Sequence, residues 1–183
     1  MLTNIYINLE DTLLCSSDPE SHSWIPRKGI PLKVQYPTLD PLNPTYAEEY
    51  LIDARPHALE ILTHLRNIAP TKLLTETIRN YALAVNTAIN LNFHPADIIA
   101  REDWLTPGNY EPVSKNLDPS SFLIEHKPGP IWEEEQSFEW EKRTYLGLRK
   151  KSVFKIRKFT GQDPETFSQE IKALIAKITQ TAQ

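Results

Sequence analysis

The stretch Thr3–Leu14, which reads Thr-Asn-Ile-Tyr-Ile-Asn-Leu-Glu-Asp-Thr-Leu-Leu, decides the fold. Its first part, Asn4–Ile7, is a β-branched and aromatic run bounded by polar residues, and such a run predicts a short strand. Four residues with oxygen-bearing side chains follow, namely Asn8, Glu10, Asp11 and Thr12. Open α/β sheets hold their ligands at the carboxyl ends of the parallel strands. The stretch therefore predicts a buried parallel strand with a polar site at its end.

The composition of the 183 residues is that of an ordinary soluble globular domain, with 40% hydrophobic and 24% charged residues. A net charge of −4 gives no electrostatic basis for binding nucleic acid or an anionic membrane. No apolar run approaches the roughly 18 residues that cross a bilayer, and no secretion signal is visible. The single cysteine, Cys15, excludes an internal disulfide and favours a reducing compartment, so we expect an intracellular, cytoplasmic location.

The remainder of the chain predicts strands that alternate with helices, the pattern of a parallel sheet with helices on both faces. Three helices are expected from apolar side chains at helical spacing. The first opens at Arg55-Pro56, the second has Thr75 or Thr77 as its cap, and the third follows Asp163-Pro164-Glu165 with Phe167, Ile171, Leu174, Ile175 and Ile178 inward. The further strands are expected at Lys72–Leu74, Asp97–Ala100, Phe122–Ile124 and Val153–Ile156.

Residues 15–54 form a long, proline-containing connection after the first strand. Two short strands are expected within it, at Ile30–Tyr36 and Tyr50–Asp53, and the prolines restrict them to sheet edges. Long connections in compact domains are usually functional or inserted. We therefore predict a single domain over residues 1–183, with a small inserted β element at 15–54 beside the site.

Six short segments resemble, in order and spacing, the motifs of haloacid-dehalogenase-superfamily phosphatases of the CTD-phosphatase, or NLI-interacting-factor, branch. Asn8–Leu13 is similar to the first motif of that branch, Asp-Leu-Asp-Glu-Thr-Leu. The other segments are Arg55–His57, Leu73–Glu76 with Tyr81-Ala82, Arg101–Asp103, Pro112–Leu117 and Leu123–Pro128. The resemblance implies an α/β fold of the haloacid-dehalogenase, Rossmann type, with three α/β/α layers, a central parallel sheet, a small β insert and no large cap domain.

The resemblance also implies a role for each matched position. Asn8 stands at the position of the nucleophilic aspartate, and Glu10 stands at that of the general acid and base. Thr75 and Lys115 match the phosphate-binding residues. Mg²⁺ would be held by the side chain of residue 8, by the backbone carbonyl two residues on, and by the fourth motif at Glu125 and His126.

Three of these positions depart from the chemistry that the reaction needs. Covalent catalysis requires an anionic oxygen, and the amide of Asn8 is neutral. Glu10 is one methylene longer than aspartate, and a displacement of about 1 Å can cost 10²-fold in rate. Mg²⁺ prefers carboxylate oxygens, whereas Asn8 offers an amide and His126 an imidazole. The departures predict that the aspartyl-phosphate reaction is absent.

Structural roles are open for the same residues. Asn8 and Glu10 would also serve as caps of a turn or helix, and Thr75 as a helix cap. Lys115 would lie exposed in a proline-rich loop. His126 with Glu125 and Glu10 is an alternative ligand set for an ion softer than Mg²⁺.

Residues 129–151 combine an acidic, aromatic segment with a basic cluster. One interpretation is a solvated charged surface in which lysines protect an edge strand. The other is a docking surface, because exposed tryptophans and arginines form binding hot spots. The docking candidates are Trp132, Trp140, Arg149, Lys150 and Lys151.

Three functions follow from these observations. The first is a catalytically degenerate phosphatase-fold protein that binds a protein partner or a phosphorylated ligand. The second is an active or slow Mg²⁺-dependent phosphatase that uses Glu10 or Asp11 in the lost role. The third is a structural component that docks in a larger assembly through the segment from Trp132 to Trp140. None of the three involves a membrane or nucleic acid.

Overall fold

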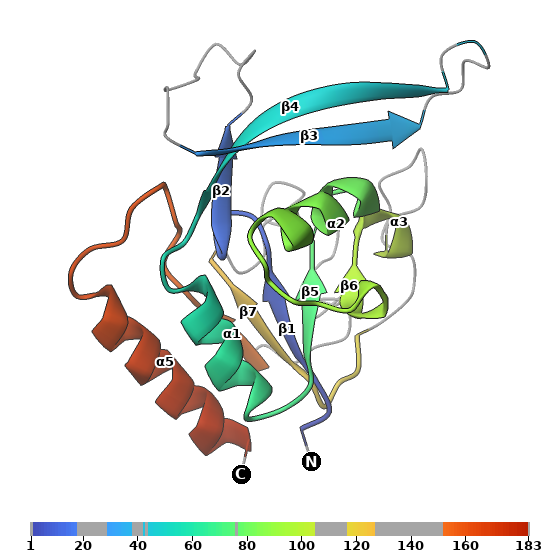
Figure 1. The fold of residues 1–183 in the computed structure, drawn as a ribbon. Coiled ribbons are helices and arrows are strands. Elements are labelled where there is room, and N and C mark those ends of the chain that lie inside the picture. The colour runs from blue at the N-terminus through green and yellow to red at the C-terminus, as the bar shows by residue number, and fades with distance from the viewer. Residues whose placement is uncertain are drawn as a thin grey trace, which may run out of the picture.

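The computed structural model describes residues 2–17, 29–37, 42, 44–75, 77–104, 117–126 and 152–182. Its centre is a five-stranded parallel sheet with the strand order β6-β5-β1-β7-β8 (Figure 1). The strands are β1 (Ile5–Asn8), β5 (Thr71–Leu74), β6 (Ile98–Ile99), β7 (Phe122–Glu125) and β8 (Val153–Lys155). The predicted α/β class with a central parallel sheet is confirmed.

Strand β1 lies in the middle of this sheet, between β5 and β7. Its four side chains are all buried, and Ile5 and Ile7 are completely so. A parallel strand that is covered on both faces reads as a nearly continuous apolar run, as this one does. The strand is shifted by one residue from its predicted range, so that Asn8 is its last residue rather than the first residue after it.

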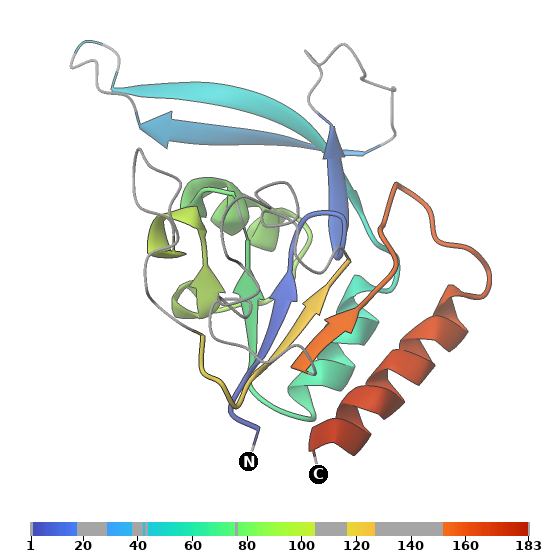
Figure 2. The same cartoon turned by 180° about the vertical axis from the view of Figure 1, so that it is seen from behind.

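The longer described helices are α1 (Ala58–Arg66), α2 (Arg79–Ala88) and α5 (Phe167–Ala182), and the short ones are η1 (Pro95–Asp97) and α3 (Arg101–Trp104). The β1–α1–β5 and β5–α2–β6 connections run in the same direction along the sheet, and right-handed crossovers place both helices on one face. Helix α5 lies beside α1 (Figures 1 and 2). Of its five predicted inward residues, Phe167, Ile171 and Ile178 are buried, and Leu174 and Ile175 pack against the core.

The predicted caps of two helices are wrong, namely Thr75 or Thr77 for α2 and Asp163 for α5, because groups from other parts of the chain take over. Ile78 precedes α2 and makes no side-chain cap, and the backbone N–H of Arg79 donates instead to both carboxylate oxygens of Glu102, at 3.1 and 3.0 Å. The carboxylate of Asp163, expected at the start of α5, binds the guanidinium of Arg55. None of the helices in the described ranges is long and apolar enough to cross a membrane.

A second, three-stranded antiparallel sheet has the strand order β2-β4-β3, formed by β2 (Leu14–Ser17), β3 (Ile30–Pro37) and β4 (Thr45–Ala54). Pro31 and Pro37 lie in β3, which is an edge strand as the prolines predicted. The strand predicted at Tyr50–Asp53 lies in β4, which is central in this sheet, so its predicted edge position is wrong. The β3–β4 hairpin is longer than expected and lies over α2, near the carboxyl ends of the parallel strands (Figure 1). A hydrogen bond joins the hairpin to α2, from Nδ2 of Asn80 to the carbonyl of Gln35, at 3.0 Å. The limits of the insert, residues 15–54, stay a prediction.

Candidate active site

The site lies at the carboxyl ends of β1, β5 and β7, the three central strands of the parallel sheet. Asn8 is the last residue of β1, Thr75 follows β5 directly, and Glu125 is the last residue of β7. Their exposed fractions are 8%, 1% and 5%, respectively. The parallel register therefore brings together three polar residues that are far apart in sequence, and buries them.

The amide of Asn8 joins two of the oxygen atoms that surround it. Its Nδ2 donates one hydrogen bond to the backbone carbonyl of Glu10 and another to Oε1 of Glu125, both at 3.0 Å. The same Oε1 accepts a hydrogen bond from the backbone N–H of His126 at 3.0 Å, and the Nδ1 of that imidazole lies 2.9 Å away. Both N–H bonds of the Asn8 amide thus have an acceptor, and Oε1 of Glu125 lies close to three nitrogen atoms.

This donor set does not fit Mg²⁺ as it is arranged. Mg²⁺ requires oxygen ligands in near-octahedral geometry at about 2.0–2.1 Å. The amide nitrogen of Asn8 carries protons where a ligand would need a free electron pair, and its bonds go to the two oxygens of the implied metal set. In the part of the chain that the structure describes, no three His, Cys, Asp or Glu residues are grouped so that they could hold a metal ion.

Glu10 and Thr75 form the second half of the site. The hydroxyl of Thr75 donates to Oε2 of Glu10 at 2.7 Å and accepts from the backbone N–H of Thr77 at 3.1 Å. The hydroxyl of Thr77 lies 2.8 Å from that of Thr75 and 3.5 Å from Oε1 of Glu10. A phosphoryl oxygen bound by Thr75 would therefore replace the carboxylate of Glu10 as acceptor.

Asp11 faces away from this pair. It has a left-handed backbone, with φ of 56°, which Asp tolerates better than most residues. Its carboxylate lies 2.9 Å from Nζ of Lys158 and 3.7 Å from Nε2 of His126, and its carbonyl accepts from the backbone N–H of Phe159 at 2.7 Å. Asp11 therefore serves to join the loop after β1 to the segment after β8.

The family model of the NLI interacting factor-like phosphatases matches residues 4–128. The chain belongs to this family. No curated protein matches the chain.

Solved structures that share the fold of this family member include two of the phosphatase Fcp1. One is the fission yeast RNA polymerase II CTD phosphatase Fcp1-R271A bound to beryllium fluoride, with 13% identity and a TM-score of 0.54 over 98% of this chain and 51% of the other. The other is Fcp1, described as an essential RNA polymerase II CTD phosphatase, with the same identity and TM-score over 98% and 50%. The chain spans about half the length of these structures. The expected haloacid-dehalogenase-like fold of the CTD-phosphatase branch is confirmed.

Arg55 holds the site loop of this family member in a way that the sequence did not reveal. The residue is 2% exposed, and its guanidinium donates to the carbonyls of Thr12 and Arg157, each at 2.7 Å, and makes three hydrogen bonds with Asp163. It also lies over the ring of Phe167, 4.1 Å from the centroid. The Arg-Pro segment pointed to the family, but nothing in it indicated these partners.

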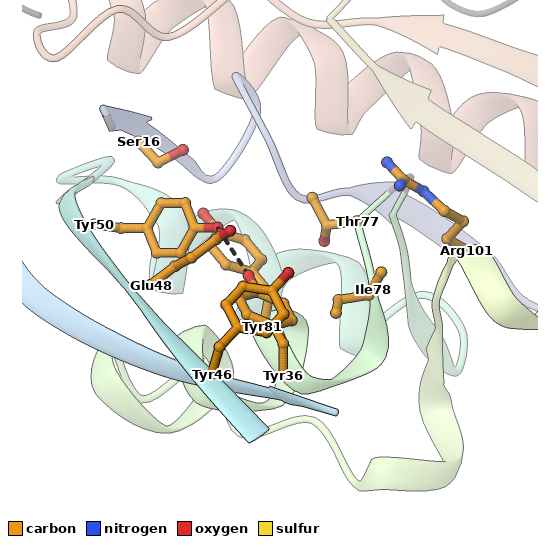
Figure 3. Close-up of a pocket in the computed structure, with 9 residues that line it drawn as sticks. All are labelled: Ser16, Tyr36, Tyr46, Glu48, Tyr50, Thr77, Ile78, Tyr81 and Arg101. Atoms are coloured by element: carbon orange, nitrogen blue, oxygen red, sulfur yellow. Dashed lines mark hydrogen bonds between the residues drawn. The ribbon is translucent and has the colours of Figure 1, made fainter. Parts of the chain in front are cut away.

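A tyrosine-lined cavity of about 300 Å³ lies beside the site (Figure 3). The hydroxyls of Tyr36 and Tyr50 are 2.8 Å apart, and Tyr50 donates to Glu48. Thr77 lines the cavity and also contacts the Glu10–Thr75 pair, so the two spaces adjoin. The residues around it come from β2, the β3–β4 hairpin, the start of α2 and α3, and are Ser16, Tyr36, Tyr46, Glu48, Tyr50, Thr77, Ile78, Tyr81 and Arg101.

Burial raises the pKa of three of these phenols, Tyr36, Tyr50 and Tyr81, above its ordinary value, so that their hydroxyls stay protonated at neutral pH. Tyr81 is 3% exposed, and its hydroxyl makes no hydrogen bond of good geometry with the described residues, although Ser16 lies beside it. The cavity was missed because its tyrosines are dispersed over 46 positions of sequence, from 36 to 81, and no local motif joins them.

The structure describes some of the predicted site residues and not others. It brings together Asn8, Glu10, Thr75, Glu125 and His126. Six predicted residues lie outside the described ranges, and they are Lys115, Trp132, Trp140, Arg149, Lys150 and Lys151. Their phosphate-binding and docking roles stay predictions.

Proposed function

We propose that this protein is a catalytically degenerate member of its phosphatase family, which binds a phosphorylated protein segment without hydrolysing it. The observation that carries the proposal is the amide of Asn8, which stands at the end of the central strand and donates both of its N–H bonds to neighbouring oxygens. A neutral amide held in this way has no anionic oxygen with which to attack phosphorus. Loss of a nucleophile in other hydrolases costs on the order of 10⁶ in turnover.

The other groups at the site indicate the class of ligand. Thr75 offers a buried hydroxyl at the end of β5, where open α/β sheets bind ligands, and Lys115 supplies a cation by the family resemblance. The adjoining tyrosine-lined cavity suits the polypeptide next to a phosphorylated residue, because tyrosines present both apolar rings and hydroxyls. The similar Fcp1 structures are of a phosphatase that acts on a protein substrate, the polymerase CTD. An intracellular, phosphorylated protein is therefore the proposed partner.

The second candidate is an active or slow phosphatase, and it is favoured by the contact between Glu10 and Thr75, 2.7 Å apart. An acid beside a phosphate-binding hydroxyl is the arrangement that proton transfer would need. Asp11, the other acid considered for the lost role, is engaged by Lys158, so this candidate rests on Glu10 alone.

Two assays separate the candidates. Hydrolysis of an aryl phosphate with Mg²⁺ is compared between the native protein and Glu10→Gln, and no turnover above buffer is expected from either. Turnover that disappears in Glu10→Gln would show that the site is an enzyme.

Binding is measured by fluorescence polarisation with a degenerate phosphoserine and phosphothreonine peptide mixture and its unphosphorylated counterpart. Thr75→Val is expected to weaken phosphopeptide binding by roughly 10-fold or more, because a hydrogen bond to a charged group is lost. Thr87→Val is the matched control, since that hydroxyl bonds only within α2. Equal affinity for both peptide mixtures would contradict the proposal.

A further inference from the structure

We infer that the amide group of Asn8 replaces a metal ion in this site, so that the site is complete without a divalent cation. The inference deepens the proposed function and rests on it, because both start from the residue at position 8. Its basis is an arrangement of two acceptors, the carbonyl of Glu10 and the carboxylate of Glu125, around the –NH₂ group of Asn8.

The hydrogen-bond balance of these groups is the first argument. A primary amide has two N–H donors, and Asn8 directs one to each of the two oxygens, at 3.0 Å. A cation and an N–H bond satisfy the same lone pairs of an oxygen. The two acceptors that a metal would hold are therefore satisfied by protons instead, and the burial of Asn8 and Glu125 makes an unsatisfied acceptor there costly.

The charge balance is the second argument. Two carboxylates at positions 8 and 125 would face each other across about 3 Å of buried space, and like charges so close need a cation between them or a proton on one of them. With Asn8 the pair carries one carboxylate, and its Oε1 is also approached by the backbone N–H and the imidazole of His126. The site is thus balanced by donors that belong to the chain.

A single substitution should reverse the exchange. Asn8→Asp removes the two N–H donors, restores the second carboxylate and leaves the carbonyl of Glu10 as a further oxygen, a set that suits Mg²⁺ or Mn²⁺. Asn67→Asp is the matched control, because it adds the same charge at an exposed position, directly after α1.

The test is a titration of MgCl₂ and MnCl₂, followed by thermal unfolding and by calorimetry of Mn²⁺ binding. The native protein and Asn67→Asp are each expected to unfold at the same temperature in EDTA as in 10 mM Mg²⁺. Asn8→Asp should unfold at a lower temperature than the native protein in EDTA. At 10 mM Mg²⁺ the unfolding temperature of Asn8→Asp should rise by roughly 3–6 °C, if the ion binds with a dissociation constant near 1 mM.

Two results would overturn the inference. One is Mn²⁺ binding by the native protein that Glu125→Gln abolishes, since the ion would then lie at this carboxylate. The other is a folded Asn8→Asp that binds no divalent ion. If Asn8→Asp does not fold even with Mg²⁺, the native titration still decides. A different observation would contradict the proposed function, namely turnover of the aryl phosphate by the native protein, which the assay detects whether or not a metal is bound.

Discussion

Arg55 and Asn8 are both buried side chains that join the loop after β1 to a carboxylate far along the chain. Arg55 donates to the carbonyl of Thr12 and to Asp163, and Asn8 donates to the carbonyl of Glu10 and to Glu125. The first link is a charged pair, with exposed side-chain fractions of 0% and 5%. The second link is a neutral amide with a carboxylate.

The difference shows what each link is for. The Arg55 cluster compensates a buried carboxylate with a buried cation and joins the loop after β1 to the segment before α5. The Asn8 cluster lies where ligands of parallel sheets bind, and its amide supplies donors without supplying charge. Removing Arg55 would leave an uncompensated buried charge, whereas removing the Glu125 carboxylate would leave only unpaired N–H donors, which cost less. The two clusters should therefore respond very differently to substitution.

The largest effect is expected from Arg55→Ala. Removing one member of a buried ion pair typically costs about 3–5 kcal/mol, because the other charge stays buried without a partner. The free energy of unfolding should fall by that amount in urea denaturation. Arg157→Ala is the control, since the Arg157–Glu170 pair is exposed and should contribute far less.

A double substitution sharpens this prediction. If the cost of Arg55→Ala comes from the carboxylate left behind, Arg55→Ala with Asp163→Ala should be less than additive in the same urea experiment. Full additivity would mean that Arg55 stabilises the fold through the ring of Phe167 and through its carbonyl partners instead.

A smaller effect is expected from Glu125→Ala. The substitution leaves an N–H of the Asn8 amide and the backbone N–H of His126 without their acceptor, and a buried donor in that state costs roughly 1–3 kcal/mol. Glu125→Gln keeps an amide oxygen at the same place and should cost less. If the two variants unfold at the same urea concentration, the Asn8–Glu125 link contributes nothing to stability.

The smallest effect is expected from Tyr81→Phe. The hydroxyl makes no hydrogen bond of good geometry with the described residues, so its removal should change stability at pH 8 by less than about 0.5 kcal/mol, or raise it. Together with Glu125→Ala, this variant compares the stability contributed by a buried group that has hydrogen-bond partners with that of one that has none of good geometry.

The same variant has a predicted pH dependence. Burial raises the pKa of Tyr81 above its ordinary value of 10.0, so above pH 10 the unfolded chain loses this proton while the folded protein keeps it. The native protein should therefore lose stability relative to Tyr81→Phe as pH rises from 10 to 11, and below pH 9 the difference should be constant. Urea unfolding of both proteins across this range measures it. A difference that does not change with pH would mean that the phenol titrates at its ordinary pKa in the fold.

Sequence reasoning found the sheet because apolar runs and helical spacing are local properties. It placed all five parallel strands, with a shift of one residue at Asn8, and it placed the three longer helices. It missed β2 and shortened the β3–β4 hairpin, because strand pairing over such distances depends on partners that the local pattern does not contain. It also assigned helix caps to Thr75, Thr77 and Asp163. The two threonines contact Glu10 and each other instead, and Asp163 binds Arg55.

The sequence by itself determined the residue types of the site, since a neutral amide at position 8 is a chemical fact before any folding. It also determined the fold family, through motifs spread along most of the chain. Only the tertiary structure decided that this amide reaches both Glu10 and Glu125, that Arg55 binds the loop after β1, and that dispersed tyrosines line one cavity. The physical reason is that hydrogen bonds and burial depend on distance in space, and the register of a parallel sheet sets that distance for residues more than a hundred positions apart.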